Sequence, residues 1–225
     1  MRNLGHIIGI GLTAGFVTLG CGDSAGPSTT TGYDWRLVVA YDSAGIPKMD
    51  TLSFHWPRSS LPVKIWVEDQ DSLPARVQEG ITLWKTAFTS GEWNATIVAD
   101  SSTADVIFRA APPPPVLRAS DLRFHALLSP CFGATDVQTG ATRFELLEPI
   151  HSYVFPSFPN DPNITRCLRT VAAHELGHTM GLFQHSPDSL DLMYAFPTAT
   201  TLSARDIATA RDAYHTPSDM VPVRP

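Results

Sequence analysis

The sequence predicts an α+β fold, one domain that combines a small β-sheet with three helices. Within residues 61–67, Val63, Ile65 and Val67 alternate with Lys64 and Trp66, which is typical of a strand with one buried face. Residues 72–90 place Val77, Ile81, Trp84 and Phe88 at helical spacing, so these side chains share one face of a predicted helix. The order of elements is strands and one helix, then an irregular stretch, then two helices. This order, which contains no internal repeat, favours an α+β domain over a repeat protein.

The other elements of the first two thirds are predicted from short local patterns. Residues 35–39 and 52–56 are apolar stretches on either side of a turn-like segment at 42–45, and they predict a β-hairpin or a pair of edge strands. Asp71 or Ser72 can cap the first helix, and Gly91 is expected to end it. Further strands are expected at 95–98, 105–108, 127–128, 143–147 and 150–155, with a polyproline segment at 112–115.

Two helices are predicted in the last third of the chain. Asn163 can cap a helix with an apolar stripe that ends near Gly181. Ser203 and Asp206 have the spacing of a capping box at the start of the final helix, which Pro217 closes.

Composition narrows the class of protein. The chain has 225 residues, of which 43% are hydrophobic and 17% are charged, which is enough apolar material for one core. The net charge of −6 argues against a nucleic-acid partner, because binders of a phosphate backbone are usually basic. The 19 prolines favour many loops and short strands.

The N-terminal segment reads as an export signal. Arg2 precedes an uncharged run at residues 7–19 that is too short to span a bilayer, which takes ~20 residues. The run ends in VTLGC, which resembles a bacterial lipobox, although Thr18 occupies the usual leucine position. We therefore expect a signal peptide at 1–20 and a lipid anchor at Cys21. The alternative is an ordinary secretory signal, with Cys21 left as a stray thiol.

Both versions of the signal place the folded domain outside a bacterial cytoplasm, either anchored at the cell envelope or secreted. Residues 21–32 are small and polar, as in a flexible tether. The domain is expected to span 33–218, with a C-terminal tail at 219–225. Contact with a membrane is expected only through the possible anchor at Cys21.

Cysteine usage agrees with an oxidising compartment. If Cys21 is lipidated, Cys131 and Cys167 remain as a pair, and a disulfide between them is the first expectation. Two buried free thiols are the alternative. Neither cysteine belongs to a CxxC pair, which argues against a zinc ribbon.

The segment with the clearest chemistry is HELGHTMGLFQH at 174–185. On a helix, His178 lies one turn beyond His174 and only about 40° around the axis, so both imidazoles can point to one metal ion. Glu175 flanks that point, where its carboxylate can take a proton from an activated water.

The residues after this helix strengthen the metal prediction. Gly181 can leave the helix with positive φ and turn the chain back, so that His185 can supply a third ligand. Three imidazoles leave zinc an open position for water, which is the arrangement of catalytic zinc sites. Met193 follows in the segment LMY, just before the last helix.

At this point the sequence resembles the metzincin metallopeptidases, in particular the matrixin-like branch. The resemblance depends on HELGHTMGLFQHS at 174–186, LDLMYAFP at 190–197 and LSARDIATARDAY at 202–214, with weaker similarity over 61–109. It implies a zinc-dependent endopeptidase with a small twisted mixed β-sheet, two main helices above the cleft, and a C-terminal helix after a methionine turn.

The resemblance also implies roles for individual residues. The metal ligands would be His174, His178 and His185, with Glu175 as the catalytic base. A peptide or protein substrate would lie extended along an edge strand within 124–155, and residues 195–198 would form part of the pocket wall. We expect a monomer.

The chain departs from the family pattern at several places. The usual third histidine stands three residues after the glycine, where this chain has Gln184, so Gln184 is an alternative ligand to His185. We keep His185, because archaemetzincins resemble this longer spacing and His185-Ser186 matches the His-Ser of matrixins. The histidine cluster of the vertebrate structural zinc site and a cysteine-switch segment are not found in the sequence. Tyr194 is not assigned as a ligand.

Two other functions remain open. One is an extracytoplasmic binding or adhesion lipoprotein with a vestigial zinc site. The other is a metallohydrolase for a non-peptide amide or ester. The intact Glu175 argues against the first, because a binding module needs no general base, and the methionine turn does not suggest the second.

Overall fold

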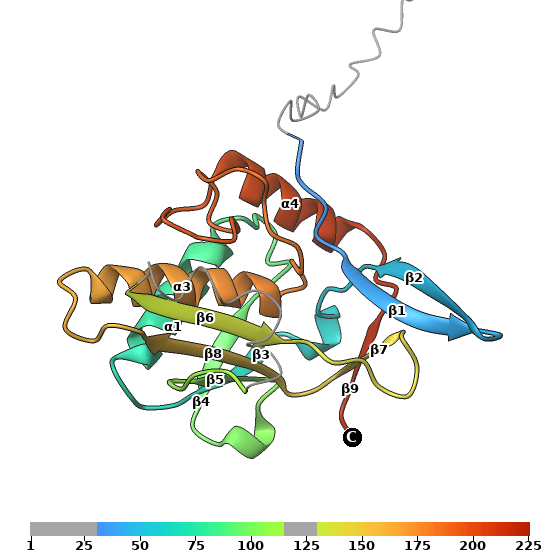
Figure 1. Cartoon of the computed structure of the whole chain (residues 1–225), viewed down its shortest axis with the longest axis horizontal. Helices are drawn as coiled ribbons and strands as arrows, with labels where there is room; N and C mark the ends of the chain where they lie inside the picture. The colour runs from blue at the N-terminus through green and yellow to red at the C-terminus, as the bar shows by residue number, and fades with distance from the viewer. Residues whose placement is uncertain (1–30, 115–129) are drawn as a thin grey trace, which may run out of the picture.

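The computed structural model describes residues 31–114 and 130–225. The expected signal peptide, Cys21 with its lipid, nearly all of the tether and the expected strand at 127–128 lie outside these residues. The fold is α+β, as predicted, and its main layers are a five-stranded sheet and two helices on one face of it (Figure 1).

The main sheet has the strand order β4-β3-β5-β8-β6. Its strands are β3 (Val63–Val67), β4 (Ala95–Val98), β5 (Val106–Arg109), β6 (Cys131–Asp136) and β8 (Ile150–Pro156). The first four in spatial order pair in parallel, whereas β6 is antiparallel to β8 and forms one edge. Strands β3, β4, β5 and β8 lie within one or two residues of their predicted bounds. Strand β6 was not predicted from the residue pattern, although it is an edge strand within 124–155, where the resemblance implied one.

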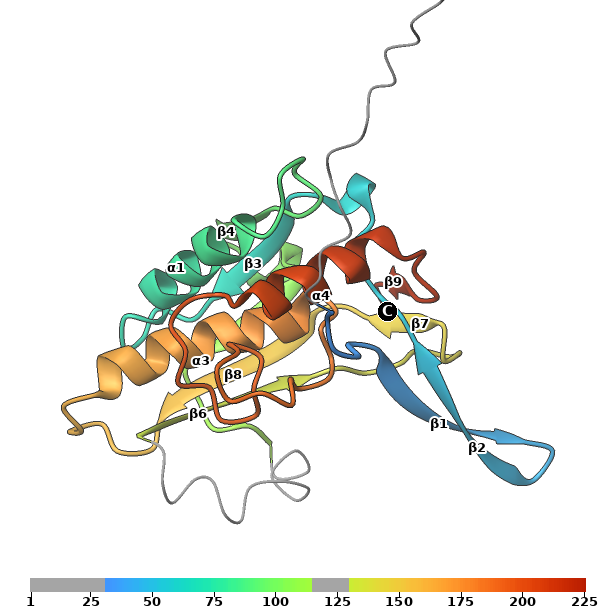
Figure 2. The ribbon, with the colours of Figure 1, turned by 90° about the horizontal axis from the view of Figure 1, so that it is seen from above.

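Helices α1 (Leu73–Lys85) and α3 (Ile164–Thr179) lie side by side on the same face of the sheet (Figures 1 and 2). The indole Nε1 of Trp84, a fully buried residue of α1, donates a 2.7 Å hydrogen bond to the carbonyl of Ala173 in α3. Gly80 allows the close approach, because a Cβ there would lie 3.2 Å from the Cα of Ala173. Helix α3 is thereby held between α1 and the edge of the sheet formed by β6 and β8.

The last helix, α4 (Ala204–His215), begins as predicted. The Ser203 hydroxyl accepts hydrogen bonds from the backbone of Arg205 and Asp206, and Asp206 accepts one from the backbone of Ser203. The capping box is therefore confirmed.

Helix α1 differs from the prediction at both ends. Ser72 occupies the N-cap position with left-handed backbone and without a side-chain cap, and the helix ends at Lys85 rather than near Gly91. The Thr86 hydroxyl bonds to the carbonyl of Leu83 and the chain leaves the helix. Phe88 still packs inward, and its ring centroid lies 4.9 Å from that of Tyr214. Its place in the apolar pattern therefore reflects burial and not membership of the helix.

The predicted hairpin exists, but its second strand was misplaced. Strands β1 (Leu37–Ser43) and β2 (Ile46–Leu52) pair antiparallel around Ala44 and Gly45, both with positive φ. Residues 53–56 are not a strand; the backbone of Ser53 instead donates to the carboxylate of Asp219. The hairpin projects from the body of the protein (Figure 2).

The C-terminal residues, expected as a tail, are packed on the domain. Strand β9 (Val221–Val223) pairs in parallel with β7 (Glu145–Leu147), and the latter lies within the predicted strand at 143–147. Arg224 also pairs with Asp105 at 2.7 Å. None of the described helices has the length and apolar character needed to cross a membrane.

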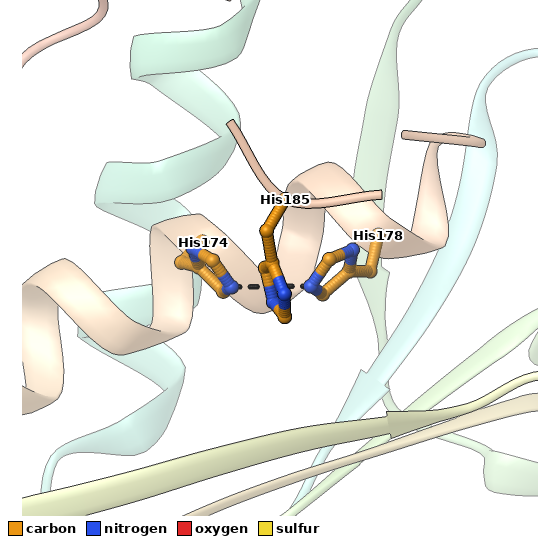
Figure 3. Close-up of side chains that lie close together, drawn as sticks. All are labelled: His174, His178 and His185. Carbon is orange, nitrogen blue, oxygen red and sulfur yellow. Dashed lines mark hydrogen bonds between the residues drawn. The ribbon is translucent and has the colours of Figure 1, made fainter. Parts of the chain in front are cut away.

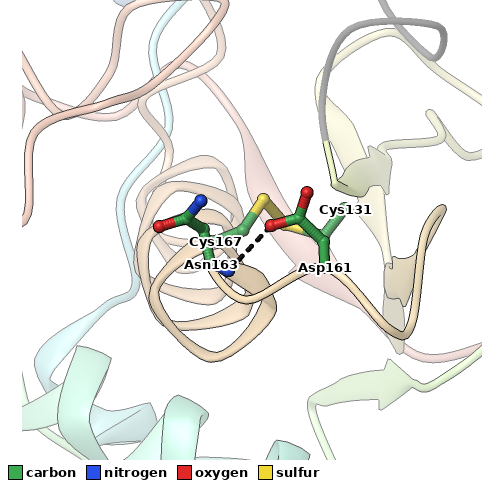
Figure 4. Close-up of a disulfide and its surroundings, with 4 residues drawn as sticks. All are labelled: Cys131, Asp161, Asn163 and Cys167. Carbon is green, nitrogen blue, oxygen red and sulfur yellow. Dashed lines mark hydrogen bonds between the residues drawn. A yellow bond between two sulfur atoms is a disulfide. The ribbon is translucent and has the colours of Figure 1, made fainter.

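The expected disulfide is present. Cys131, the first residue of β6, is bonded to Cys167 in the first turns of α3 (Figure 4). The bond links positions 36 residues apart and ties the edge strand to the helix that carries the metal motif. In the chain-entropy model a loop of this length stabilises the fold by roughly 3–4 kcal/mol.

Candidate metal centre

The two histidines of α3 are held in one defined tautomer. His174 is 3% exposed and His178 is 9% exposed. The Nδ1 of His174 lies 2.8 Å from the carbonyl oxygen of Leu192, and the Nδ1 of His178 lies 2.6 Å from that of Leu182. A carbonyl can only accept, so each Nδ1 carries the proton. Each neutral ring therefore presents the lone pair of Nε2.

These two lone pairs point toward each other. The Nε2 atoms of His174 and His178 lie 3.1 Å apart, as the dashed line in Figure 3 shows. Neither nitrogen has a proton to donate when both Nδ1 atoms are protonated, so two acceptors face each other in a buried place. Two imidazoles at ~2.0–2.1 Å from one tetrahedral zinc would have nitrogens about 3.3 Å apart. The separation therefore fits a shared metal.

Burial keeps both rings neutral. The pKa of His174 is lowered to about 3, mainly by burial and further by the nearby His185. The pKa of His178 is also lowered, again mainly by burial. Neutral imidazole is the form that binds a metal ion, so protons compete little for this pair at neutral pH.

His185 joins the pair from the loop after α3. Gly181 has φ +109, and a Cβ at this position would lie 2.2 Å from the carbonyl oxygen of Phe54, so the turn requires glycine. The ring of His185 lies 5.3 Å from that of His174 and 5.1 Å from that of His178, centroid to centroid. One nitrogen from each of the three rings lies within 4.8 Å of the other two (Figure 3).

The loop that carries His185 is bonded to the segment before β1. The backbone N–H of Phe183 donates to the carbonyl of Trp35 at 2.7 Å. The side-chain amide of Gln184 donates to the carbonyl of Arg36 at 3.1 Å. Gln184, the alternative ligand, thus bonds to this segment, while His185 faces the other two histidines.

Glu175 lies beneath the edge strand. It is 4% exposed, and its Oε2 accepts a 2.7 Å hydrogen bond from the hydroxyl of Thr135 in β6. The hydroxyl of Ser152 in β8 lies 3.1 Å from that of Thr135. Because Thr135 donates its one proton to the carboxylate, Ser152 donates to Thr135. Gly133 makes room, since a Cβ there would lie 2.4 Å from Oε1 of Glu175.

The carboxyl of Glu175 has a shifted titration. Burial raises its pKa to about 8, and the hydrogen bond from Thr135 opposes this rise. A carboxyl with a pKa near neutrality suits a group that accepts and later donates a proton. A divalent cation close to it would favour the ionised form.

The methionine turn is packed below α3 and bonded to α4. Met193 is fully buried, and a Cβ on Gly177 would lie 2.4 Å from its sulfur. The carboxylate of Asp206 accepts hydrogen bonds from the backbone N–H groups of Leu192 and Met193, at 2.8 and 3.3 Å. The carbonyl of Leu192 in turn accepts the proton of His174. Asp206 therefore helps to orient a candidate ligand through one peptide.

A second polar cluster lies under the His185 loop. Asp191, which is 1% exposed, is paired with Arg205 of α4 at 2.7 Å and accepts a short hydrogen bond from the hydroxyl of Ser186. Arg205 also pairs with Asp188. Burial opposes the charge on Asp191, but Arg205 and Ser186 outweigh it, and the pKa of Asp191 is lowered. Ser186 follows His185 directly, so this cluster fixes the backbone at the third histidine.

The sequence reasoning missed Thr135, Asp191 and Arg205, and it saw Asp206 only as a capping residue. None of these residues forms a motif with the histidines. Thr135 lies 40 positions from Glu175, and Arg205 and Asp206 each lie 14 positions from a partner in the segment around Met193. For Asp206 the capping box was the available signal. For Thr135 the sequence offered none.

The centre can bind a divalent metal and place a carboxylate beside it. In the described residues, His174, His178 and His185 form the group of three or more metal-ligating side chains that lie close together. His55, His151 and His215 are not part of it.

A comparison with protein families agrees with this arrangement. The matrixin model matches residues 77–215, which is more than half of the chain and includes most of α1, the metal motif, the methionine turn and α4. A search of curated proteins gave no match. The chain belongs to the matrixin family of peptidases.

Proposed function

We propose that this protein is a zinc-dependent endopeptidase in which His174, His178 and His185 hold the metal and Glu175 acts as general base. The observation that carries the proposal is the pair of facing Nε2 lone pairs on His174 and His178, with the His185 ring beside them. An all-imidazole set of three suits zinc and leaves a coordination position for solvent or substrate. The substrates would be peptides or proteins.

The residues of the chain divide the chemistry among them. Zinc, when bound, supplies the Lewis acidity that lowers the pKa of a water molecule and polarises a peptide carbonyl. Glu175 takes the proton of the attacking water and passes it to the departing amine. Thr135 holds one carboxylate oxygen of Glu175, which leaves Oε1 for this transfer. Strand β6 forms a sheet edge along which an extended substrate could pair.

Metal analysis and a peptidase assay together test the proposal. Purified protein should contain about one zinc per chain and cleave members of a mixed peptide library, and a chelator should abolish cleavage until zinc is restored. Glu175→Gln should fold and keep zinc but lose cleavage by several orders of magnitude. Cleavage retained by Glu175→Gln would remove Glu175 from the mechanism.

The same assays separate the alternatives. Stoichiometric zinc without turnover of any peptide would favour a binding module with a vestigial site. Turnover of esters or non-peptide amides alone would favour the other metallohydrolase. The carboxylate of Glu175 is held by a hydrogen bond from the Thr135 hydroxyl. This favours the peptidase over the binding module, because adhesion needs no general base.

We also propose that the protein is exported and anchored through lipid on Cys21. The uncharged run at 7–19 and the lipobox-like VTLGC support this. In a bacterial host, the wild type should fractionate with membranes, and Cys21→Ala should not. Equal fractionation of both would leave the secreted form.

A further inference from the structure

A cavity beside the metal centre borders the β1–β2 hairpin at Val38. The cavity has a volume of about 590 Å³, and its lining includes His185, Gln184, Arg205, Tyr33 and Val38. Val38 belongs to β1, so the hairpin supplies part of the cavity wall.

The register of the hairpin sorts its side chains onto two faces. Val38 pairs with Thr51, Ala40 with Met49, and Asp42 with Pro47, and these alternate pairs share one face. Val38 is 46% exposed and Met49 is 64% exposed, and Ala40 and Pro47 are exposed as well. We call this face, made of Val38, Ala40, Pro47 and Met49, the apolar hairpin face.

The opposite face of the hairpin is anchored to the domain. Leu37 and Val39 pack against the core. The guanidinium of Arg143 lies 4.3 Å from the ring centroid of Tyr41 and pairs with Asp50 at 2.7 Å. An isolated two-stranded sheet is only marginally stable in water, so this anchoring gives the hairpin a fixed position.

The hairpin is also joined to the metal loop. The hydrogen bonds from Phe183 to Trp35 and from Gln184 to Arg36 connect the residues just before β1 with the residues just before His185. The apolar hairpin face therefore keeps its position relative to the metal centre, and it starts at the cavity that His185 lines.

We propose that the apolar hairpin face is an exosite that binds an apolar stretch of the substrate polypeptide, several residues away from the bond that is cut. The inference rests on the proposed peptidase function and adds a substrate class to it, namely long unfolded polypeptides in preference to short peptides. Continuity with the cavity argues for the substrate as occupant. Val38 lines the cavity, and the cross-strand pair of Ala40 in β1 and Met49 in β2 lies next to it on the same face, so a chain that leaves the metal through the cavity can continue over this pair.

The test compares two peptides on the full-length zinc protein. The first is a short fluorogenic peptide that the enzyme cleaves. The second is the same peptide extended by about eight residues that include leucine and phenylalanine, in two versions, one for each side of the scissile bond. Met49→Gln removes apolar surface from the hairpin face at a residue that belongs neither to the cavity lining nor to the histidine group. Ile46→Gln is the matched control, because Ile46 is 59% exposed and lies on the other face of the hairpin.

We expect one extended peptide to have a lower KM than the short one in wild type. Met49→Gln should raise the KM of that extended peptide about tenfold, with kcat unchanged and the short peptide unaffected. Ile46→Gln should behave as wild type. Equal KM values for short and extended peptides, or equal effects of the two variants, would overturn the exosite.

A binding measurement keeps the two proposals separable. The affinity of labelled extended peptide for zinc-loaded Glu175→Gln is measured by fluorescence anisotropy, with and without Met49→Gln. If no peptide is cleaved but Met49→Gln weakens binding about tenfold, the exosite stands and the peptidase proposal fails. If Met49→Gln changes neither binding nor KM but weakens a concentration-dependent dimer in sedimentation, the face binds a second copy and the exosite is wrong.

Discussion

The hydroxyl of Thr135 donates a 2.7 Å hydrogen bond to Oε2 of Glu175, from the edge strand of the sheet to the helix that carries the metal motif. This contact joins two residues that are 40 positions apart in the chain. It fixes the carboxylate against rotation and stabilises its charged form, because a hydroxyl donor lowers the pKa that burial raises.

Replacing Thr135 with valine should therefore slow catalysis without affecting the metal. Valine keeps the volume but removes the donor, and a hydrogen bond to a charged group contributes about 1.5–3 kcal/mol. We expect kcat to fall roughly 10- to 100-fold with KM and zinc affinity unchanged, and the acidic limb of the kcat profile to move to higher pH. Thr135→Ser, which retains the hydroxyl, should restore most of kcat. A Thr135→Val enzyme with wild-type kcat and pH profile would show that Thr135 has no positioning role.

Asp191 and Arg205 should control the third histidine. Asp191→Ala removes the carboxylate that Ser186 and Arg205 share. Ser186 is the residue directly after His185. We expect zinc to bind at least tenfold more weakly in competition with a chromophoric chelator, and stability to fall by about 1–3 kcal/mol, because Asp191 is buried. The second partner of Arg205 provides the control. Asp188 is 37% exposed at the side chain, so Asp188→Ala should have a much smaller effect on both quantities. Equal effects of the two substitutions would argue against a specific link from Asp191 to His185.

The disulfide should stabilise the edge strand as well as the whole domain. It holds the start of β6 to α3, and β6 carries Thr135. The double variant Cys131→Ser, Cys167→Ser should lose roughly 3–4 kcal/mol of unfolding free energy in urea titrations. It should also lose more kcat than a surface variant of similar stability. Each single variant, Cys131→Ser or Cys167→Ser, also lacks the disulfide but retains one free thiol. Unchanged urea midpoints in the double variant would contradict the prediction.

The sequence was informative where the pattern is local. His174, Glu175 and His178 lie within one helical turn and a half, and the capping box at Ser203 needs only three residues, so both were predicted. The hairpin turn was placed near its true position at Ala44 and Gly45. Its second strand was placed too late, because Pro47 and Lys48 are typical of loops rather than strands.

Strand β6 was missed for a functional reason. Its side toward α3 carries Gly133 and Thr135, where a regular half-buried strand would carry large apolar residues. Glu175 and Val171 occupy that space, since a Cβ on Gly133 would lie 2.4 Å from both side chains. The contact that holds the candidate base thus removes the alternation by which the strand would have been recognised. Asp206 illustrates the same point, because its bonds to the methionine turn span 13 and 14 residues and leave no local signature.

In the metal-free protein, the buried histidines and Glu175 should change the free energy of unfolding in opposite directions as pH changes. The pKa of His174 falls from 6.5 to about 3 on folding, and that of His178 falls as well. At a pH between the lowered pKa of the folded state and 6.5, these two rings bind protons in the unfolded chain but not in the folded chain. The two rings therefore destabilise the fold as pH decreases below 6.5. Glu175 acts in the opposite direction, because its pKa rises from 4.5 to about 8 on folding and the folded chain binds the extra proton.

Glu175→Gln separates the two contributions. With EDTA present, this variant should lose stability between pH 7.5 and 5.5 by about 1.4 kcal/mol for each buried ring, which is about 3 kcal/mol for the pair. The wild type should lose much less over the same interval, because protonation of Glu175 offsets the rings. Urea titrations of both proteins at the two pH values measure the difference, in which the other titrating groups cancel. The same loss in both proteins would show that Glu175 is ionised in the metal-free fold, and that the bond from Thr135 outweighs burial.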